Sequence, residues 1–324
     1  MEIKLTTQSW PIRGSFTISR GSRTQAETLI VELTEQGVTG RGECVPYARY
    51  DESLESVRAE IENIQEEINT GITREQLQVL LPSGAARNAV DCALWDLECK
   101  LNQQTIWQRV GVEPTSLTTA YTLSLDSAEN MRQAALENAH RPLLKLKLGG
   151  AGDLERVQAV REGAPNAKII LDANEAWSLD DYRTLVPHLL ELDVAMIEQP
   201  FHANDDAILD DLPRPIPICA DESCHDRQSL KKIIGRYDMI NIKIDKTGGL
   251  TEALALKAEA EEAGLQVMVG CMLASSLSMA PAFVAAQNAL VVDLDGPLLL
   301  AEDIEQGIEF TDDAMLPFTP ALWG

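Results

Sequence analysis

The pattern of apolar and polar residues changes character near residue 116. From about residue 117, short apolar runs alternate with polar turns and amphipathic helical stretches, which is the pattern of successive βα units. The strand candidates begin at intervals of roughly 22 to 27 residues, a normal length for one such unit. They are residues 117–125, 143–150, 168–174, 194–200, 216–223, 239–245, 266–272 and 291–296. Parallel strands in this number, joined by helices such as those predicted at 154–164 and 251–264, favour a closed barrel.

The first 116 residues follow a different pattern. Strand signals at residues 3–12 and 27–43 include a turn signal at 35–37, and helical periodicity follows at 52–71 and 83–104. Strands followed by helices predict a separate α+β domain.

These patterns divide the chain into three segments. Residues 1–116 form the α+β domain, residues 117–300 form the barrel, and residues 301–324 are too short to fold alone. We expect this tail to pack back on one of the two domains. We also expect Ser83 to be the N-cap of the second predicted helix of the first domain.

Composition excludes several classes of partner. The net charge of −24, from 51 acidic and 27 basic residues, gives no electrostatic attraction for nucleic acid or an anionic membrane. The stretch 273–292 is long and uncharged, but serine, proline, glutamine and asparagine interrupt it, so a buried helix running into a strand is favoured over a membrane span.

The cysteines and the N-terminal residues favour a cytoplasmic protein. The six cysteines form no C-x-x-C pair, and the four histidines show no ligand spacing, which fits a reducing compartment. The first ten residues show no secretory signal.

Polar side chains stand where nearly every predicted barrel strand ends. The strand ends offer Lys145, Lys147, Asp172, Asn174, Glu198, Asp221, Glu222, Lys243, Asp293 and Asp295. Taken singly, each has an ordinary explanation as a solvated strand face, turn chemistry or a helix cap. Because catalytic groups of a βα barrel come from these ends, and because charged groups are costly to bury unpaired, their joint placement favours an active site.

Three of these residues form a candidate metal site. Asp172, Glu198 and Asp221 lie on consecutive strands, so their carboxylates should converge on one side of the barrel mouth. Oxygen ligands without His or Cys favour a hard divalent ion, with Mg²⁺ the leading candidate.

Two lysines form a candidate acid/base pair. Lys147 and Lys243 lie on the second and sixth strands, so they should face each other across the barrel and could deprotonate a carbon from either face. A metal between them would stabilise an enolate, and it would lower the lysine pKa together with Lys145. The alternative for Lys243 is a structural ion pair, which Asp245 or one of the metal-binding carboxylates could supply.

These motifs resemble the enolase superfamily, specifically its muconate-lactonizing-enzyme subgroup. The matching segments are KLK at 145–147, LDANEAW at 171–177, IEQP at 197–200, ADES at 220–223 and NIKIDKTGG at 241–249, and the resemblance covers essentially the whole chain. It implies a modified TIM barrel, (β/α)7β, under an N-terminal α+β capping domain. It also implies that Lys147 and Lys243 are the acid/base pair, with Lys246 a rival for the second base. By the same resemblance, Asp172, Glu198 and Asp221 bind one Mg²⁺ per subunit.

Within the subgroup, four shorter segments are similar to the dipeptide epimerases, especially the bacterial ones that act on L-Ala-D/L-Glu. They are RGSR at 20–23, GECVPYARY at 42–50, GCM at 270–272 and DLDGP at 293–297. The resemblance implies 1,1-proton transfer at the α-carbon of the second residue, in the recycling of cell-wall peptides. It also implies that Asp293 and Asp295 bind the substrate ammonium, and a buried cation does need an anionic partner.

The remaining substrate contacts are also inferred from this resemblance. Lys145 is expected to hold the reacting carboxylate, and Thr122, Cys271 and Met272 to line the pocket. Arg23 is a candidate for the substrate glutamate side chain, with a solvated loop charge as the alternative. Residues 46–53 are expected to form a second mobile capping loop that excludes water.

Other functions stay open at this stage. The same site could racemise N-acylamino acids or synthesise o-succinylbenzoate, although Asp293 and Asp295 argue against both. A catalytically inactive binding homologue would normally have lost a base or a metal ligand. The expected partner is a small-molecule dipeptide, whose side-chain preference the sequence does not determine, and self-association into a homo-oligomer stays undecided.

Overall fold

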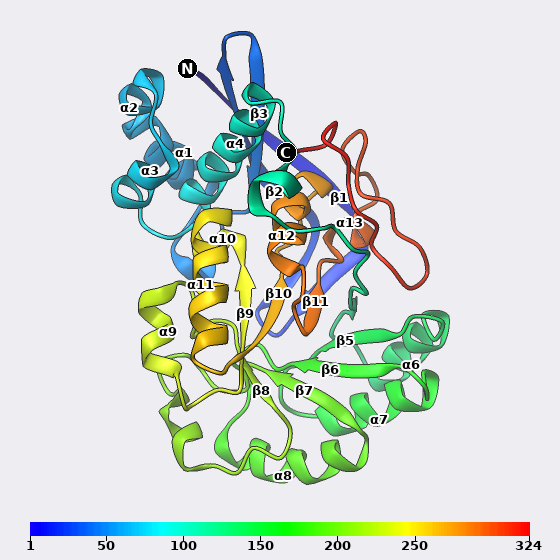
Figure 1. Cartoon of the computed structure of the whole chain (residues 1–324). Helices are drawn as coiled ribbons and strands as arrows, with labels where there is room; N and C mark the ends of the chain where they lie inside the picture. Colours follow the sequence, from blue (N-terminus) through cyan, green and yellow to red (C-terminus); the bar gives the residue numbers. More distant parts are fainter.

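A parallel sheet closed into a barrel forms the larger part of the chain (Figure 1). The computed structural model describes residues 1–324. Its eight barrel strands are hydrogen-bonded in chain order, and the first and last are joined by the Ala120 amide, which donates to the Val292 carbonyl at 2.8 Å. The strands are β4 (Tyr121–Leu123), β5 (Leu143–Lys147), β6 (Lys168–Asp172), β7 (Val194–Glu198), β8 (Ile218–Ala220), β9 (Met239–Lys243), β10 (Gln266–Gly270) and β11 (Val291–Asp293). The modified TIM barrel predicted from the sequence is confirmed.

Helices cover the outside of the barrel. They are α6 (Ala128–Glu137), α7 (Asp153–Gly163), α8 (Leu179–Glu191), η2 (Asp206–Asp211), α9 (Arg227–Ile233), α10 (Ile244–Thr247), α11 (Leu250–Glu262), α12 (Ser276–Ala286) and α13 (Gly296–Leu299). Inside, one buried apolar cluster includes a residue at or near the start of each strand: Ala120, Leu143, Ile170, Met196, Cys219, Met239, Met268 and Val291. Because apolar side chains fill this part of the interior, the polar groups of the strands gather at the carboxyl ends.

The N-terminal part folds as an antiparallel sheet with helices against it. Its elements are β1 (Glu2–Ile18), β2 (Gly21–Glu35), β3 (Val38–Cys44), η1 (Ala48–Tyr50), α1 (Leu54–Asn63), α2 (Gln65–Thr70), α3 (Arg74–Leu80), α4 (Ala85–Leu101) and α5 (Ile106–Val110). The predicted turn between β2 and β3 is confirmed, with Gln36 and Gly37 at φ 52° and 78°. Strand β3 packs directly on α4, since a Cβ at Gly42 would lie 2.2 Å from the Ala89 carbonyl oxygen.

The prediction that Ser83 caps α4 is wrong. Gly84 occupies the N-cap position, and the Ala85 amide donates to Glu52 Oε1 at 2.8 Å. Ser83 instead donates its hydroxyl to Asp226 on the barrel at 3.1 Å. A carboxylate from a distant segment therefore replaces the local cap, which residue spacing alone does not reveal.

The last residues of the chain contact both parts. Met315 exchanges backbone hydrogen bonds with Leu117, while the Trp323 indole donates to the Arg41 and Cys92 carbonyls at 3.0 and 3.1 Å. None of the helices is long and apolar enough to cross a membrane. The uncharged stretch 273–292 contains α12 and the start of β11.

Candidate active site

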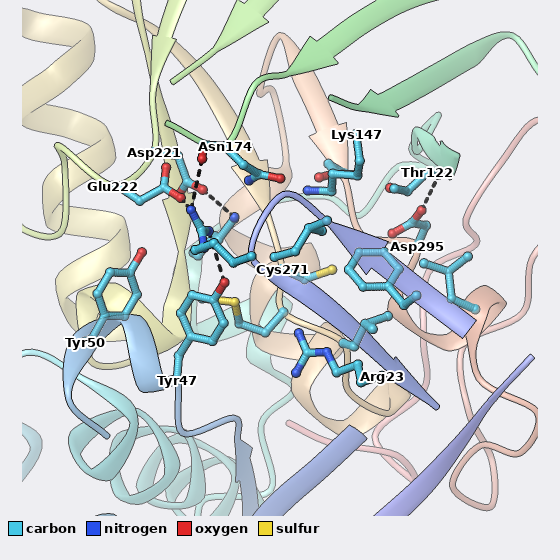
Figure 2. Close-up of a pocket in the computed structure, with 18 residues that line it drawn as sticks. Arg23, Tyr47, Tyr50, Thr122, Lys147, Asn174, Asp221, Glu222, Cys271 and Asp295 are labelled. Carbon is cyan, nitrogen blue, oxygen red and sulfur yellow. Dashed lines mark hydrogen bonds and ion pairs between the residues drawn. The ribbon is translucent and has the colours of Figure 1, made fainter. Parts of the chain in front are cut away.

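A cavity of about 50 Å³ lies between the carboxyl ends of the barrel strands and the capping segments. Figure 2 shows Asp221 and Glu222 on one side, Thr122 and Asp295 on the other, and Arg23, Tyr47 and Tyr50 reaching in from the cap. Eleven of the residues singled out from the sequence line it: Arg23, Thr122, Lys147, Asn174, Asp221, Glu222, Lys243, Cys271, Met272, Asp293 and Asp295. Lys145, Asp172 and Glu198 do not line it and are fully buried, at 0% exposure each.

Lys147 forms an ion pair with the first of the three carboxylates. Its Nζ lies 2.6 Å from Asp172 Oδ2, because the register of β5 and β6 places the two residues side by side. Burial alone would raise the pKa of Asp172, but the charges of Lys147, Lys145 and Lys243 outweigh it and lower the pKa to about 2. Asp172 is therefore ionised at neutral pH.

Lys243 is bound in the same way four strands further along the sheet. Its Nζ lies 2.7 Å from Asp221 Oδ2, while Asp245 turns away to the Val45 amide, so the suggested Lys243–Asp245 pair does not form. Burial alone would lower the pKa of Lys243, but Asp221 and Glu198 raise it above its ordinary value. The lowered lysine pKa that the sequence predicted is therefore not found for Lys243 in the protein without metal. A divalent cation bound to Asp221 and Glu198 would offset their negative charge and so lower the pKa of Lys243.

Lys145 lies beneath the cavity and connects the candidate metal ligands with the acidic residues at the end of β11. Its ammonium is 2.6 Å from Glu198, 2.7 Å from Asp293 and 3.4 Å from Asp172. These carboxylates outweigh the effect of burial and hold the pKa of Lys145 well above its ordinary value. A permanent positive charge therefore links the candidate metal ligands to the last strand.

Lys246, the rival for the second base, lies outside the cavity. Its ammonium donates to Asp221 Oδ1 and to the carbonyls of Asp221, Cys224 and Asn241, at 2.6 to 3.0 Å. All three donors of the ammonium are engaged, and its side chain is 0% exposed. This geometry makes Lys246 a support for Asp221 and favours Lys243 as the group that faces a substrate.

The oxygens present fit a hard divalent cation. Asp172, Glu198 and Asp221 come from the neighbouring strand ends of β6, β7 and β8, and the buried Glu198 Oε2 accepts no hydrogen bond, although it is paired with Lys145. Lysine ammonium groups lie against the carboxylates. In this arrangement, no three or more His, Cys, Asp or Glu side chains lie together in a geometry that would hold a metal ion. An all-oxygen, anionic donor set of this kind suits Mg²⁺.

Asp293 and Asp295 form a second acidic group at the end of β11. Asp295 Oδ2 accepts the Thr122 amide at 2.6 Å, and Asp293 Oδ2 accepts from Lys145. Asp293 Oδ1 is buried and has no hydrogen-bond partner. Burial, and the nearby charge of Asp293, raise the pKa of Asp295 to about 7. The pair thus offers unused acceptor capacity to a cationic group.

The capping side contributes residues that the strand-end rule could not find. Phe16, Ile18, Arg20, Tyr47 and Tyr50 all line the cavity. The only sequence signals were the short RGSR and GECVPYARY segments, which mark a hairpin tip and a loop without indicating which side chains point inward.

Two arginines of the hairpin differ in their partners. Arg20 donates to Glu222 at 2.9 Å, to the Asn174 carbonyl at 3.1 Å and to the Tyr47 hydroxyl at 3.1 Å. Arg23 lies 6.0 Å from the Phe16 ring centroid and has no carboxylate partner. Partial burial lowers the pKa of Arg23 from its ordinary value. Its guanidinium is therefore free to bind an anion in the cavity.

Comparisons with known proteins agree with this geometry. The chain is 46% identical over 312 residues to the L-Ala-D/L-Glu epimerase of Escherichia coli K12, covering 95% of this chain and 97% of that protein. It is 40% identical over 298 residues to an N-acetyl-D-glutamate racemase of a Pseudoalteromonas species, covering 91% and 95%.

Solved structures give the same fold. An enolase family member from Agrobacterium tumefaciens with homology to dipeptide epimerases, which holds sodium and L-Ala-L-Glu, matches at TM-score 0.98 and 50% identity over 99% of both chains. A dipeptide epimerase from Enterococcus faecalis, complexed with Mg and L-Leu-L-Tyr, matches at TM-score 0.91 and 29% identity over 98% of this chain and 96% of that one.

Two family descriptions account for most of the sequence. Residues 1–111 match the mandelate racemase / muconate lactonizing enzyme N-terminal domain, and residues 126–318 match the enolase C-terminal domain-like family. The fold, the strand-end lysines and carboxylates, and these matches together show that the chain belongs to the enolase superfamily, in its mandelate racemase and muconate lactonizing enzyme branch.

Proposed function

We propose that this protein is a Mg²⁺-dependent dipeptide epimerase that inverts the α-carbon of the second residue, with L-Ala-D-Glu and L-Ala-L-Glu as its substrate pair. The observation that carries the proposal is the opposed pair Lys147 and Lys243, both lining one cavity whose end wall holds Asp293 and Asp295. The relatives named as L-Ala-D/L-Glu epimerase and the neighbour that holds L-Ala-L-Glu support the choice of dipeptide.

The two lysines perform the proton transfer. One removes the α-proton of the second residue, and the opposite lysine returns a proton to the other face, so that configuration is inverted without redox chemistry. Each ammonium is held by one carboxylate, Lys147 by Asp172 and Lys243 by Asp221, which fixes its position on a rigid strand end. Lys145, positively charged beneath the cavity, attracts the carboxylate whose charge grows as the proton leaves.

Magnesium is assigned to Asp172, Glu198 and Asp221. When bound there, one Mg²⁺ ion supplies positive charge that stabilises the negative charge developing on the substrate carboxylate. The Mg-bound dipeptide epimerase from Enterococcus faecalis supports this choice of metal.

Asp293 and Asp295 are assigned to the free ammonium of the first residue. The unpartnered Asp293 Oδ1 can accept one of its hydrogen bonds, and Asp295 contributes a second carboxylate from the same strand end. A buried ammonium needs such partners, whereas an N-acyl group has no charge to place there. The pair therefore selects a dipeptide.

Other lining residues are assigned to the rest of the substrate. Arg23 is placed to bind the glutamate side-chain carboxylate, because its guanidinium lacks a partner in the protein. Thr122, Cys271 and Met272 supply the walls between the two ends. A solvated role for Arg23 is disfavoured by its position on the cavity.

The capping segments must open to admit the substrate. A cavity of about 50 Å³ is far below the roughly 300 to 1,000 Å³ of ordinary ligand sites. Arg20 and Arg49 bind the barrel carboxylates Glu222 and Glu175 at 2.9 Å, so opening breaks these ion pairs. Closure then excludes water from the reacting carbon.

Racemisation of N-acylamino acids is the second candidate, and one observation favours it. The Pseudoalteromonas N-acetyl-D-glutamate racemase is 40% identical to this chain, close to the 46% of the Escherichia coli epimerase. The acidic pair argues for the dipeptide, as it does against o-succinylbenzoate synthesis. Both lysines and all three carboxylates are present, which argues against an inactive homologue.

The proposed location is the cytoplasm. All six cysteines are free, which fits a reducing compartment. The proposed partner is a small dipeptide.

Proton exchange with solvent tests the proposed reaction. The protein is incubated with Mg²⁺ and L-Ala-D-Glu in deuterium oxide, and ¹H NMR follows the glutamyl α-proton. We expect deuterium at that carbon together with formation of L-Ala-L-Glu. Absence of both exchange and epimerisation would reject the reaction.

A further inference from the structure

The sequence motif at residues 241–249 includes residues that have no role in the candidate active site. Lys243 lines the cavity and Lys246 supports Asp221, but Asp245, Thr247 and the glycine pair 248–249 have no role there. These residues form α10 and its link to α11, and they lie against α4 of the capping domain (Figure 1). The contact joins a capping helix to the segment that follows one candidate base.

Asn88 of α4 holds Asp245 in place. Its side-chain amide donates to Asp245 Oδ1 at 2.8 Å, and the Val45 amide donates to the same oxygen at 2.9 Å. Asn88 and Asp245 are buried, at 0% and 4% exposure. Because Asp245 follows Lys243 by two residues, these bonds fix the chain where β9 ends.

Arg87 of α4 holds the next part of the same segment. Its guanidinium donates to the Thr247 carbonyl at 2.6 Å and to the Gly248 carbonyl at 3.2 Å. It also donates to the Gln78 and Leu81 carbonyls of the capping domain, and it forms no ion pair. Arg87 is 6% exposed. The donors of a buried guanidinium need hydrogen-bond acceptors, and here these are backbone carbonyls whose position depends on the conformation of the chain. Arg87 therefore favours one position of α10.

The glycine pair allows α4 to approach this closely. A Cβ at Gly248 would lie 2.4 Å from Arg87 Nε, and a Cβ at Gly249 would lie 2.4 Å from Asp91 Oδ2. Both glycines also have positive φ, 77° and 106°. The end of the motif is therefore explained by contact with the capping helix.

The other lysine has no contact with α4, although its Nζ lies 5.9 Å from the ring centroid of Phe16 on β1. Lys147 is followed by a loop whose Gly149 and Gly150 amides donate to Asp153 at the start of α7. None of the hydrogen bonds of α4 reaches this loop. Helix α4 therefore acts on only one side of the cavity.

We propose that Asn88 and Arg87 are positioning residues for Lys243, through Asp245 and the carbonyls of Thr247 and Gly248. Proton transfer on the Lys243 face then depends on helix α4, while transfer on the Lys147 face does not. This inference rests on the proposed two-lysine reaction.

Exchange measured separately from each epimer tests it. L-Ala-D-Glu and L-Ala-L-Glu are each incubated in deuterium oxide with Mg²⁺, and the initial loss of the α-proton is followed by ¹H NMR. Lys243→Ala identifies the epimer that loses its proton to Lys243, because the other epimer should keep exchanging through Lys147. We expect Asn88→Ala to slow exchange of that same epimer by about 10- to 100-fold and the other by less than about threefold.

A matched variant separates positioning from general damage to the helix. Asp96→Ala also removes a buried polar side chain of α4, but Asp96 faces the C-terminal residue, whose amide it accepts at 2.7 Å. Equal slowing of both epimers by Asn88→Ala, or the same one-sided loss in Asp96→Ala, would overturn the inference.

A second variant decides the question if Asn88→Ala does not fold. Arg87→Met keeps an apolar stem but loses the bonds to the two carbonyls, so it should show the same one-sided loss, and symmetric slowing would overturn the inference. If the unaltered protein exchanged neither epimer, the proposed function itself would fail, which is a separate result.

Discussion

The two walls of the cavity differ in how their residues reach it. On the barrel wall, Lys147, Lys243 and Asp293 lie at the ends of parallel strands that buried neighbours hold on both sides. On the capping wall, Arg23 and Tyr47 come from a hairpin and a loop that ion pairs hold against the barrel. The groups proposed to move protons thus stand on rigid elements, while the groups proposed to recognise a side chain stand on segments proposed to open. The following predictions test this division.

Removing the acidic pair should have the largest effect. Asp293→Asn combined with Asp295→Asn removes both charged partners of a buried ammonium, a loss of about 2 to 5 kcal/mol, so kcat/KM for L-Ala-L-Glu should fall by about 30-fold or more. Mg²⁺ binding, measured by isothermal titration calorimetry, should persist because the three assigned ligands are unchanged. Normal dipeptide turnover by the double variant would refute the ammonium assignment.

Loss of Arg23 should affect one class of substrate. Arg23→Met removes a charge-assisted hydrogen bond worth about 1.5 to 3 kcal/mol, so kcat/KM for L-Ala-L-Glu should fall by about 10- to 150-fold. The change for L-Ala-L-Gln, which has no side-chain charge, should be much smaller. Arg13→Met, an exposed arginine on the same hairpin, is the matched control. Equal losses for both dipeptides would show that the capping wall does not recognise the side-chain charge.

A pH profile should reveal the state of Asp295. Its pKa of about 7 means that the carboxyl is mostly neutral at pH 6 and ionised at pH 8, and only the ionised form attracts an ammonium. We therefore expect kcat/KM for L-Ala-L-Glu to rise by about three- to fivefold across this range, because the gain in ionised Asp295 exceeds the loss of protonated dipeptide amine, whose pKa is about 7.7 to 8.0. Asp295→Asn should remove the rise. A flat profile in the unaltered protein would contradict this explanation.

The residues of the barrel wall could be predicted from the sequence because the barrel strands recur at regular intervals along the chain. Apolar strands at regular spacing place Asp172, Glu198 and Asp221 at one end of the barrel without any knowledge of distant contacts. The closed barrel was expected for the same reason, while its modified (β/α)7β form was implied by the family resemblance, and the structure confirms the barrel.

The capping wall could not be derived in this way. Arg20 contacts Glu222 across 202 positions of the chain, and Asn88 contacts Asp245 across 157. No local pattern encodes such pairs, because they depend on how two folded parts dock. The incorrect N-cap at Ser83 has the same origin, since the replacing carboxylate of Glu52 comes from another segment. Of the two kinds of partner considered for Lys243, the candidate metal ligand Asp221 binds it and Asp245 does not.

Substrate preference tests the central claim most directly, because we propose that the acidic pair separates a dipeptide from an N-acylamino acid on this site. The measurement is kcat/KM for L-Ala-L-Glu and for N-acetyl-L-glutamate, with the same protein and Mg²⁺ concentration. We predict that the dipeptide is preferred by about 30-fold or more, since only its ammonium satisfies the buried carboxylates. Equal or faster turnover of N-acetyl-L-glutamate would contradict the claim and favour an N-acylamino acid racemase.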